Sequence, residues 1–159
     1  MFNFKNEEHK FFVSPQKGKA VSIREIPDEV FSEKILGDGV GIIPQEDIIV
    51  SPVDGKIVQI ADTKHALCIT SDDGIDVMIH VGVDTVGLKG EGFECNVSVG
   101  QHVKAGEKIG SADIKFIKEK GYPLHTAVLV TNMASVGEFI PIYGDVEAGV
   151  TKIVEYTKK

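Results

Sequence analysis

Two histidines in the middle of the chain have the residue type and the spacing for shared chemistry. His65 and His80 flank an Asp73-Gly74 pair, and Asp-Gly between two alternating runs is a strong signal for a tight hairpin turn. Such a hairpin would bring the two imidazoles together. A neutral imidazole has one bare nitrogen that can attack phosphorus or bind a metal, while its other nitrogen carries a proton. The pair could therefore act as a nucleophile, on phosphorus for example, or bind a metal.

The residues around His80 alternate in polarity, which predicts a half-buried strand over residues 75–84. A two-residue turn would place His80 opposite Leu67, whereas a four-residue loop would place it opposite His65. Both registers put the two imidazoles on one face of the sheet, within roughly 8 Å of each other. A three-residue loop with a bulge would change this pairing.

Thr63, two residues before His65, would project from the same face, and Asp84 would also meet the histidines there. Phosphoryl transfer asks mainly for positioning and charge stabilisation. One histidine would accept the group, the other would donate a hydrogen bond to its oxygens, and a hydroxyl would orient the donor. The same spacing also suits zinc. Because a third protein ligand is not evident, zinc on His65 and His80 is expected only where a partner shares the site.

The rest of the chain has the pattern of an all-β protein. Residues 13–23 recur at 50–60 with the Val-Ser-Pro and Gly-Lys elements identical, and each copy brackets a turn with proline and glycine before an alternating strand. This internal repeat indicates a duplicated β architecture. Helix is expected only at 27–31 and 112–120. Further short β-type runs, which favour a β-sandwich or barrel, lie at 40–43, 108–110, 126–131 and 151–156.

Length and composition predict one folded domain. A chain of 159 residues with 42% hydrophobic content can bury a single core. We expect a flexible tail at residues 1–12 and one domain at 13–159. The net charge of −7 and the pI of about 5.2 exclude nucleic acid as a partner, because its phosphates need a basic surface.

The cysteines and the apolar runs indicate a cytoplasmic protein. Cys68 and Cys95 lack the C-x-x-C spacing of a metal or redox motif, and we interpret them as reduced structural thiols. The first ten residues carry charges where a secretory signal needs an apolar core. The longest apolar runs are too short to cross a bilayer, so stable membrane insertion is not expected.

Four motifs resemble those of one family, the glucose-type enzyme IIA of the bacterial sugar phosphotransferase system. They are H-V-G-V-D-T-V-x-L-K-G-E-G-F at 80–93, T-x-H-A at 63–66, P-D-E-V-F-S-E-K-I-L-G-D-G at 27–39 and V-S-P-V-D-G at 50–55. The resemblance extends from about residue 13 to residue 154. It implies an antiparallel β-sandwich of the duplicated hybrid type with one or two very short helices.

The same resemblance implies a phosphotransferase that serves as a phosphocarrier in sugar uptake. It implies that His80 accepts the phosphoryl group from phospho-HPr, that His65 stabilises the phosphoryl oxygens, and that Thr63 orients His65. The group would then pass to a cysteine on the IIB domain of an IIB/IIC sugar permease. Neither a cofactor nor an obligatory metal is implied.

A surface for protein partners is also implied by the resemblance. Asp28 and Asp84 match acidic positions that meet a basic donor protein. Phe31, Met78 and Val86 would form an apolar rim that excludes water; the term apolar rim is kept for these three residues. A second reading of Asp28 is that it caps the short helix that follows it, and the two roles are compatible.

Two other functions compete with the phosphocarrier. A regulatory binding protein would report its phosphorylation state to transporters or metabolic enzymes without passing the group on. A biotinyl or lipoyl carrier is suggested by the strand-turn-strand pattern at 100–109. Such carriers present a modified lysine at a hairpin tip, and the tip at 71–74 has none.

Overall fold

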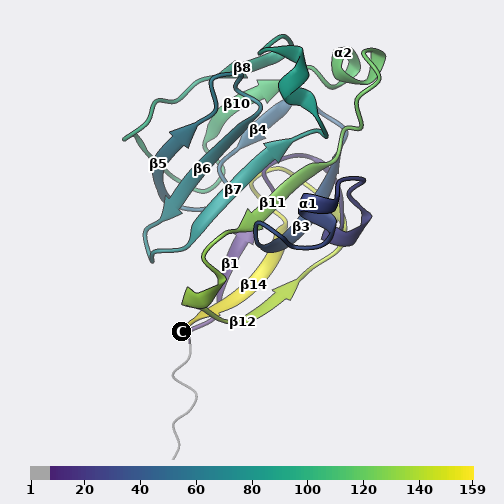
Figure 1. The fold of residues 1–159 in the computed structure, drawn as a ribbon. Helices are drawn as coiled ribbons and strands as arrows, with labels where there is room; N and C mark the ends of the chain where they lie inside the picture. Colours follow the sequence, from purple (N-terminus) through teal and green to yellow (C-terminus); the bar gives the residue numbers. More distant parts are fainter. Residues whose placement is uncertain (1–7) are drawn as a thin grey trace, which may run out of the picture.

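The structure, a computed structural model, describes residues 8–159 and consists mainly of antiparallel β-strands (Figure 1). An eight-stranded sheet contains, in spatial order, β13 (Gly144–Val146), β2 (Gly18–Ser22), β3 (Asp38–Pro44), β11 (Thr126–Val130), β7 (Asp76–Val81), β6 (Ala66–Ser71), β5 (Gly55–Ile60) and β9 (His102–Val103). One smaller sheet has the order β1 (Lys10–Val13), β14 (Lys152–Lys158), β12 (Val136–Pro141). The other has the order β4 (Ile48–Val50), β10 (Lys108–Ala112), β8 (Phe93–Cys95).

The helices are short, as the sequence predicts. They are α1 (Glu29–Ser32), α2 (Ile114–Glu119) and the 3-10 turns η2 (Ile23–Glu25), η3 (Thr85–Leu88) and η4 (Met133–Ser135). Asp28 and Asp113 cap α1 and α2, because each carboxylate accepts a hydrogen bond from a backbone N–H of the first turn. The prediction of an all-β fold with very short helices is confirmed. Within residues 8–159, none of the helices has the length and apolarity that a membrane span requires.

The expected flexible tail at 1–12 is wrong where the structure describes it. Residues 1–7 lie outside the described part of the chain, but Lys10–Val13 form β1 and pair with β14. Phe12 is buried, and its ring lies 5.0 Å from that of Tyr156. Burial of an aromatic side chain stabilises this pairing, so the folded domain includes Lys10.

The two copies of the internal repeat have the same local structure. In each Val-Ser-Pro element the serine hydroxyl donates to the carbonyl two residues later, at 2.6 Å in both copies. The valine N–H of each copy donates to the proline carbonyl of the other, at 3.1 and 2.8 Å. The repeat therefore forms two equivalent turns that bind each other and lead into β2 and β5.

Strand β7 has the predicted alternation. Its odd-numbered side chains are buried in the main core, whereas its even-numbered ones, His80 among them, are half-buried on the other face. That outer face is partly covered by the segment 23–31, which lies beside β3 and β11 (Figure 1). A second apolar cluster forms there from Ile23, Ile26, Phe31, Val83, Ala127 and Leu129, with Met78 packed against it.

The β6–β7 hairpin does not have either predicted register. Ala66 pairs with His80, and the loop contains three residues, 72–74. Two bonds between Ser71 and Ile75 help to close it: the Ser71 N–H donates to the Ile75 carbonyl at 2.8 Å, and the Ile75 N–H donates to the Ser71 hydroxyl at 2.9 Å. Gly74 has φ +90°, which glycine adopts at little cost. The serine and the glycine together select the three-residue loop.

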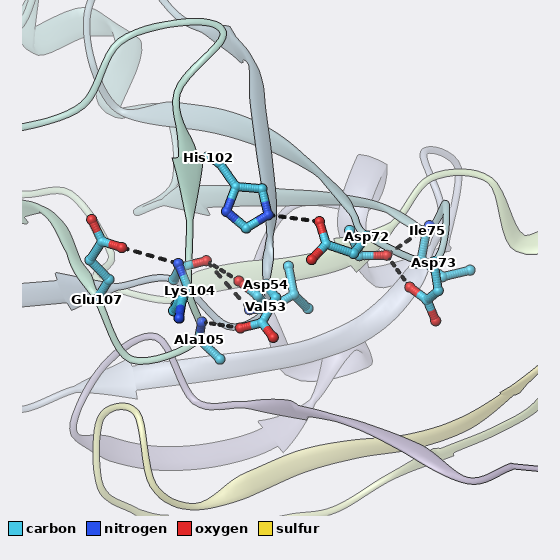
Figure 2. A network of polar contacts seen from close by, with 11 residues as sticks. Val53, Asp54, Asp72, Asp73, Ile75, His102, Lys104, Ala105 and Glu107 are labelled. Atoms are coloured by element: carbon cyan, nitrogen blue, oxygen red, sulfur yellow. Dashed lines mark hydrogen bonds and ion pairs between the residues drawn. The ribbon is translucent and has the colours of Figure 1, made fainter.

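Neighbouring loops hold the hairpin tip in place, as Figure 2 shows. The Asp72 carboxylate accepts a hydrogen bond from Nε2 of His102 at 2.8 Å, and the Asp72 N–H donates to the Asp54 carbonyl at 2.9 Å. The Asp54 carboxylate accepts from the N–H of Ala105 at 2.8 Å. These contacts anchor β7 at the end opposite to His80.

Candidate functional site

The rings of His65 and His80 lie edge to face, with centroids 4.8 Å apart and planes at 82°. The sequence predicts this proximity, but by a register that is wrong, because Ala66 and not His65 is the partner of His80. His65 lies just before β6 and follows Lys64, whose φ is +61°. The chain is irregular there, and the imidazole of His65 reaches His80 although strict alternation would place it on the other face.

The turn after β7 determines which nitrogen of His80 is free. Nδ1 lies 3.0 Å from the carbonyl oxygen of Gly82. A carbonyl can only accept, so Nδ1 carries the proton and Nε2 has the lone pair. Burial lowers the pKa of His80, while the Gly82 carbonyl and the carboxylates of Asp28 and Asp84 oppose part of this shift. The His80 imidazole is therefore neutral at pH 7.

His65 is held by Thr63. The Thr63 hydroxyl lies 2.6 Å from Nδ1 of His65. His65 is only 8% exposed. The ring of Phe93 lies 6.5 Å away on another side. Burial, and next the nearby His80, lowers the pKa of His65 below its usual value of 6.5. Two neutral imidazoles thus lie next to each other. In each, Nδ1 is hydrogen-bonded to a residue two positions away in the chain.

The two acidic residues lie in the segments that flank His80. Asp28 is the N-cap of α1, where its Oδ1 accepts from the Val30 N–H at 2.9 Å. Asp84 is exposed and precedes η3 as its N-cap, with φ +62°, and its side chain makes no capping bond. Both carboxylates act on the charge state of His80. The capping role that the sequence suggests for Asp28 is thus present together with a position near His80.

The apolar rim is only partly a rim. Val86 is 56% exposed and Met78 is half-buried, but Phe31 is 4% exposed. The Phe31 ring lies 4.8 Å from the ring of His80 and belongs to the second apolar cluster. Phe31 is therefore not part of an exposed rim: its ring forms a wall beside His80, whereas Val86 and Met78 remain accessible at the surface.

No group of three or more histidine, cysteine, aspartate or glutamate side chains is placed to hold a metal ion within residues 8–159. Cys68 and Cys95 are both free thiols. Cys68 lies on the His80 face, since it pairs with Met78 two residues along the hairpin. It borders a small hollow of about 80 Å³ that Ala66 and Met78 also line.

Sequence reasoning misses the contribution of the backbone to this site. The Gly82 carbonyl fixes the tautomer of His80, but a carbonyl has no signal in the residue type. The available clue is the glycine itself, because its φ of +78° is a left-handed conformation that other residues rarely adopt. Thr85, in the same motif, is fully buried, and its hydroxyl donates to the Val81 carbonyl.

Comparison with known proteins gives one family. Residues 10–136 match the family described as phosphoenolpyruvate-dependent sugar phosphotransferase system, EIIA 1. Over 156 residues the chain is 45% identical to the PTS system glucose-specific EIIA component of Bacillus cereus, which spans 97% of this chain and 93% of that protein. Over 128 residues it is 47% identical to the PTS system glucosamine-specific EIICBA component of Bacillus subtilis, spanning 80% of this chain and 20% of that protein.

A solved structure agrees with this result. The glucose permease IIA from Mycoplasma capricolum superimposes with a TM-score of 0.88 and 33% sequence identity, covering 98% of this chain and 99% of that one. The similarity therefore includes the sheets, the hairpin and the segments that position the two histidines. The chain belongs to the EIIA 1 family of the phosphoenolpyruvate-dependent sugar phosphotransferase system.

Proposed function

We propose that this chain takes a phosphoryl group from phospho-HPr onto Nε2 of His80 and passes it to the cysteine of a sugar-permease IIB domain. Its family consists of phosphotransferases that carry phosphoryl groups in sugar uptake. The observation that carries the choice of atom is the 3.0 Å contact between Nδ1 of His80 and the Gly82 carbonyl. It leaves Nε2 as the nitrogen with a lone pair.

In the first transfer, Nε2 of His80 attacks phosphorus while the bond from phosphorus to the donor histidine breaks. Such a transfer passes through a loose, in-line transition state, in which charge spreads over the phosphoryl oxygens. With the Thr63 hydroxyl donating to Nδ1 of His65, the proton of His65 lies on Nε2. His65 can then donate to a phosphoryl oxygen without reorganisation, which is the form of charge stabilisation that enzymes use most.

The second transfer reverses these roles. The thiolate of the IIB cysteine attacks phosphorus, and His80 leaves as a neutral imidazole. The proton stays on Nδ1 throughout, because Nδ1–H donates a hydrogen bond to the Gly82 carbonyl before and after phosphorylation. No proton has to move to or from His80 in either direction, which suits a carrier that must both accept and release the group.

The partner surface rests on charge and exposure. Asp28 and Asp84 lie beside the acceptor in a protein of net charge −7, which suits a basic donor, and Val86 and Met78 offer apolar area next to them. The same face would receive HPr and IIB in turn. Free thiols at Cys68 and Cys95 are typical of a reducing compartment, so we place the protein in the cytoplasm.

The test is reconstitution with phosphoenolpyruvate, enzyme I and HPr, followed by intact mass and then by addition of the IIB domain. Wild type should gain one acid-labile phosphoryl group and lose it to IIB, with or without a chelator. His80→Ala should gain none. His9→Ala, which removes an exposed histidine just before β1 that pairs with Glu155, is the matched control and should behave as wild type. Stable phosphorylation of His80→Ala would refute the acceptor assignment.

A further inference from the structure

The turn that follows His80 is closed by a side chain with no role so far. Thr85 is fully buried, and its Oγ1 donates a hydrogen bond to the Val81 carbonyl at 2.5 Å. The bond spans the turn that contains Gly82, with φ +78°, and Asp84, with φ +62°. Two left-handed residues so close together are an unusual backbone path, which persists only when surrounding contacts determine it.

The methyl group of Thr85 completes the closure. A Cβ added at Gly82 would collide with Cγ2 of Thr85, so the methyl lies directly against the Gly82 backbone. Both branches of one threonine thus contact the turn: the hydroxyl binds the residue before Gly82, and the methyl covers Gly82 itself. The carbonyl of this same glycine accepts the hydrogen bond from Nδ1–H of His80.

The other side of the turn is bound to the segment that leads into β11. The Gly82 N–H donates to the His125 carbonyl at 3.0 Å, and the Val83 N–H donates to the Pro123 carbonyl at 3.1 Å. The second bond belongs to the same peptide unit as the Gly82 carbonyl. That peptide is therefore held at both ends, with the Pro123 carbonyl on one side and Nδ1–H of His80 on the other.

We propose that Thr85 is a positioning residue for phosphoryl transfer: by closing the turn, it aims the Gly82 carbonyl at Nδ1 of His80 and so keeps Nε2 free for attack. The proposal rests on the proposed function for its kinetic consequence, but its structural part concerns the resting protein alone. Without the Thr85 hydroxyl the turn can relax, and the Gly82 carbonyl moves off Nδ1. The neutral ring then distributes its proton between both nitrogens, and the form with Nε2–H cannot attack.

The chain offers a matched control. Thr126 is also fully buried and pairs with Val81 from the neighbouring strand β11. Unlike Thr85, it has a hydroxyl with no hydrogen-bond partner among the described residues. Thr85→Val and Thr126→Val therefore make the same chemical change at the same depth, and only the first removes a hydrogen bond. Thr85→Ser keeps the hydroxyl and removes the methyl.

The experiment measures the side-chain ¹⁵N shifts of His80 by NMR and the rate of phosphorylation by phospho-HPr in a single turnover. Wild type, Thr126→Val and Thr85→Ser should show the Nδ1–H tautomer. Thr85→Val should show a mixture of tautomers and a rate lower by roughly 10- to 100-fold, the cost of a small misplacement of a reacting group. If Thr85→Val does not fold, Thr85→Ser and Thr85→Ala can be compared instead, because the first keeps the hydroxyl group and the second lacks it.

The outcomes separate this proposal from the proposed function. A Thr85→Val protein with the wild-type tautomer and the wild-type rate would overturn the positioning role and leave His80 as the acceptor. A tautomer shift in Thr85→Val, in a protein whose wild type takes no phosphate from phospho-HPr, would support the positioning role and refute the function. An equal shift in Thr126→Val would show that loss of any buried threonine hydroxyl disturbs the ring, which would also overturn the proposal.

Discussion

At the scale of single residues, His80 and His65 differ in what holds them. His80 is held by a backbone carbonyl in its own turn, and His65 is held by the hydroxyl of Thr63. A carbonyl fixes the proton on the nitrogen that faces it, whereas a hydroxyl can either donate or accept. His80 is thus confined to one tautomer; in the proposed mechanism, His65 can adapt to the phosphoryl oxygens.

His65→Gln should separate the two transfers. The nitrogen that attacks in the first step remains, but a neutral amide replaces the group placed to stabilise the developing charge. We expect phosphorylation by phospho-HPr to persist, while transfer to IIB slows roughly 100-fold, about 3 kcal/mol in the transition state. A single-turnover assay with isolated phosphorylated protein measures the second step. An unchanged rate would remove His65 from the mechanism.

Burial of both histidines predicts a pH dependence of stability. Their pKa values are lowered in the folded protein, so the unfolded chain binds more protons as the pH falls through about 6.5. Their contribution to stability is complete above that pH and is lost below it. The free energy of unfolding should thus fall between pH 7 and pH 5 more steeply in wild type than in the double variant His65→Gln/His80→Gln. Urea titrations at each pH give the two slopes. Equal slopes would contradict the burial effect.

The sequence predicts the identity of these residues better than their geometry. The resemblance marks Thr63, His65 and His80, and the structure brings the three together. The sequence could not show that Phe31 is buried beside His80, because an aromatic residue in a short helix fits an exposed rim equally well. The Gly82 carbonyl is also invisible in the residue types, since every residue has one.

At the scale of elements, the site depends on the register of the β6–β7 hairpin and on the covering segment, residues 23–31, which partly covers the His80 face of β7. Ser-Asp-Asp-Gly at 71–74 is compatible with loops of two, three or four residues, and each length gives another register. The Ser71 hydroxyl and Gly74 close the three-residue loop, and the Asp72–His102 contact, which comes from a distant part of the chain, holds its tip. Local sequence therefore predicts the hairpin but not its register.

Asp28 caps α1 and also acts on the charge state of His80, and these two roles can be separated. Asparagine caps helices about as well as aspartate but carries no charge. Asp28→Asn should therefore leave the free energy of unfolding unchanged, whereas Asp28→Ala should lower it by about 1 kcal/mol. Urea unfolding measures both. If the two variants were equally stable, the bond from the Val30 N–H to Asp28 would contribute nothing to stability.

At the scale of the whole molecule, an acidic protein carries His80 close to two carboxylates, those of Asp28 and Asp84. Charges at the edge of an interface mainly alter the association rate, whereas apolar anchors mainly alter the dissociation rate.

The sequence predicts the duplicated sandwich because alternation and turn residues recur along the chain. The covering segment 23–31 is harder to predict, because its position results from packing against β7 and β11.

The double variant Asp28→Asn/Asp84→Asn should associate with phospho-HPr more slowly than wild type. Its rate should also depend less on salt between roughly 0.05 and 0.5 M, where the Debye length shrinks. Val86→Ala, which truncates an exposed apolar side chain, should instead raise the dissociation rate and leave the salt dependence as it is. Stopped-flow traces measure all three proteins. Identical association of the double variant and wild type at every ionic strength would exclude these carboxylates from the interface.

The most direct test of the account is the position of the phosphate in the phosphorylated protein. ³¹P and ¹⁵N NMR of the wild type, after incubation with phosphoenolpyruvate, enzyme I and HPr, reports both the residue and the ring nitrogen. The geometry of the Gly82 turn predicts a single phosphate on Nε2 of His80, with Nδ1 still protonated and bound to the carbonyl. A phosphate on His65, or on Nδ1 of His80, would contradict it.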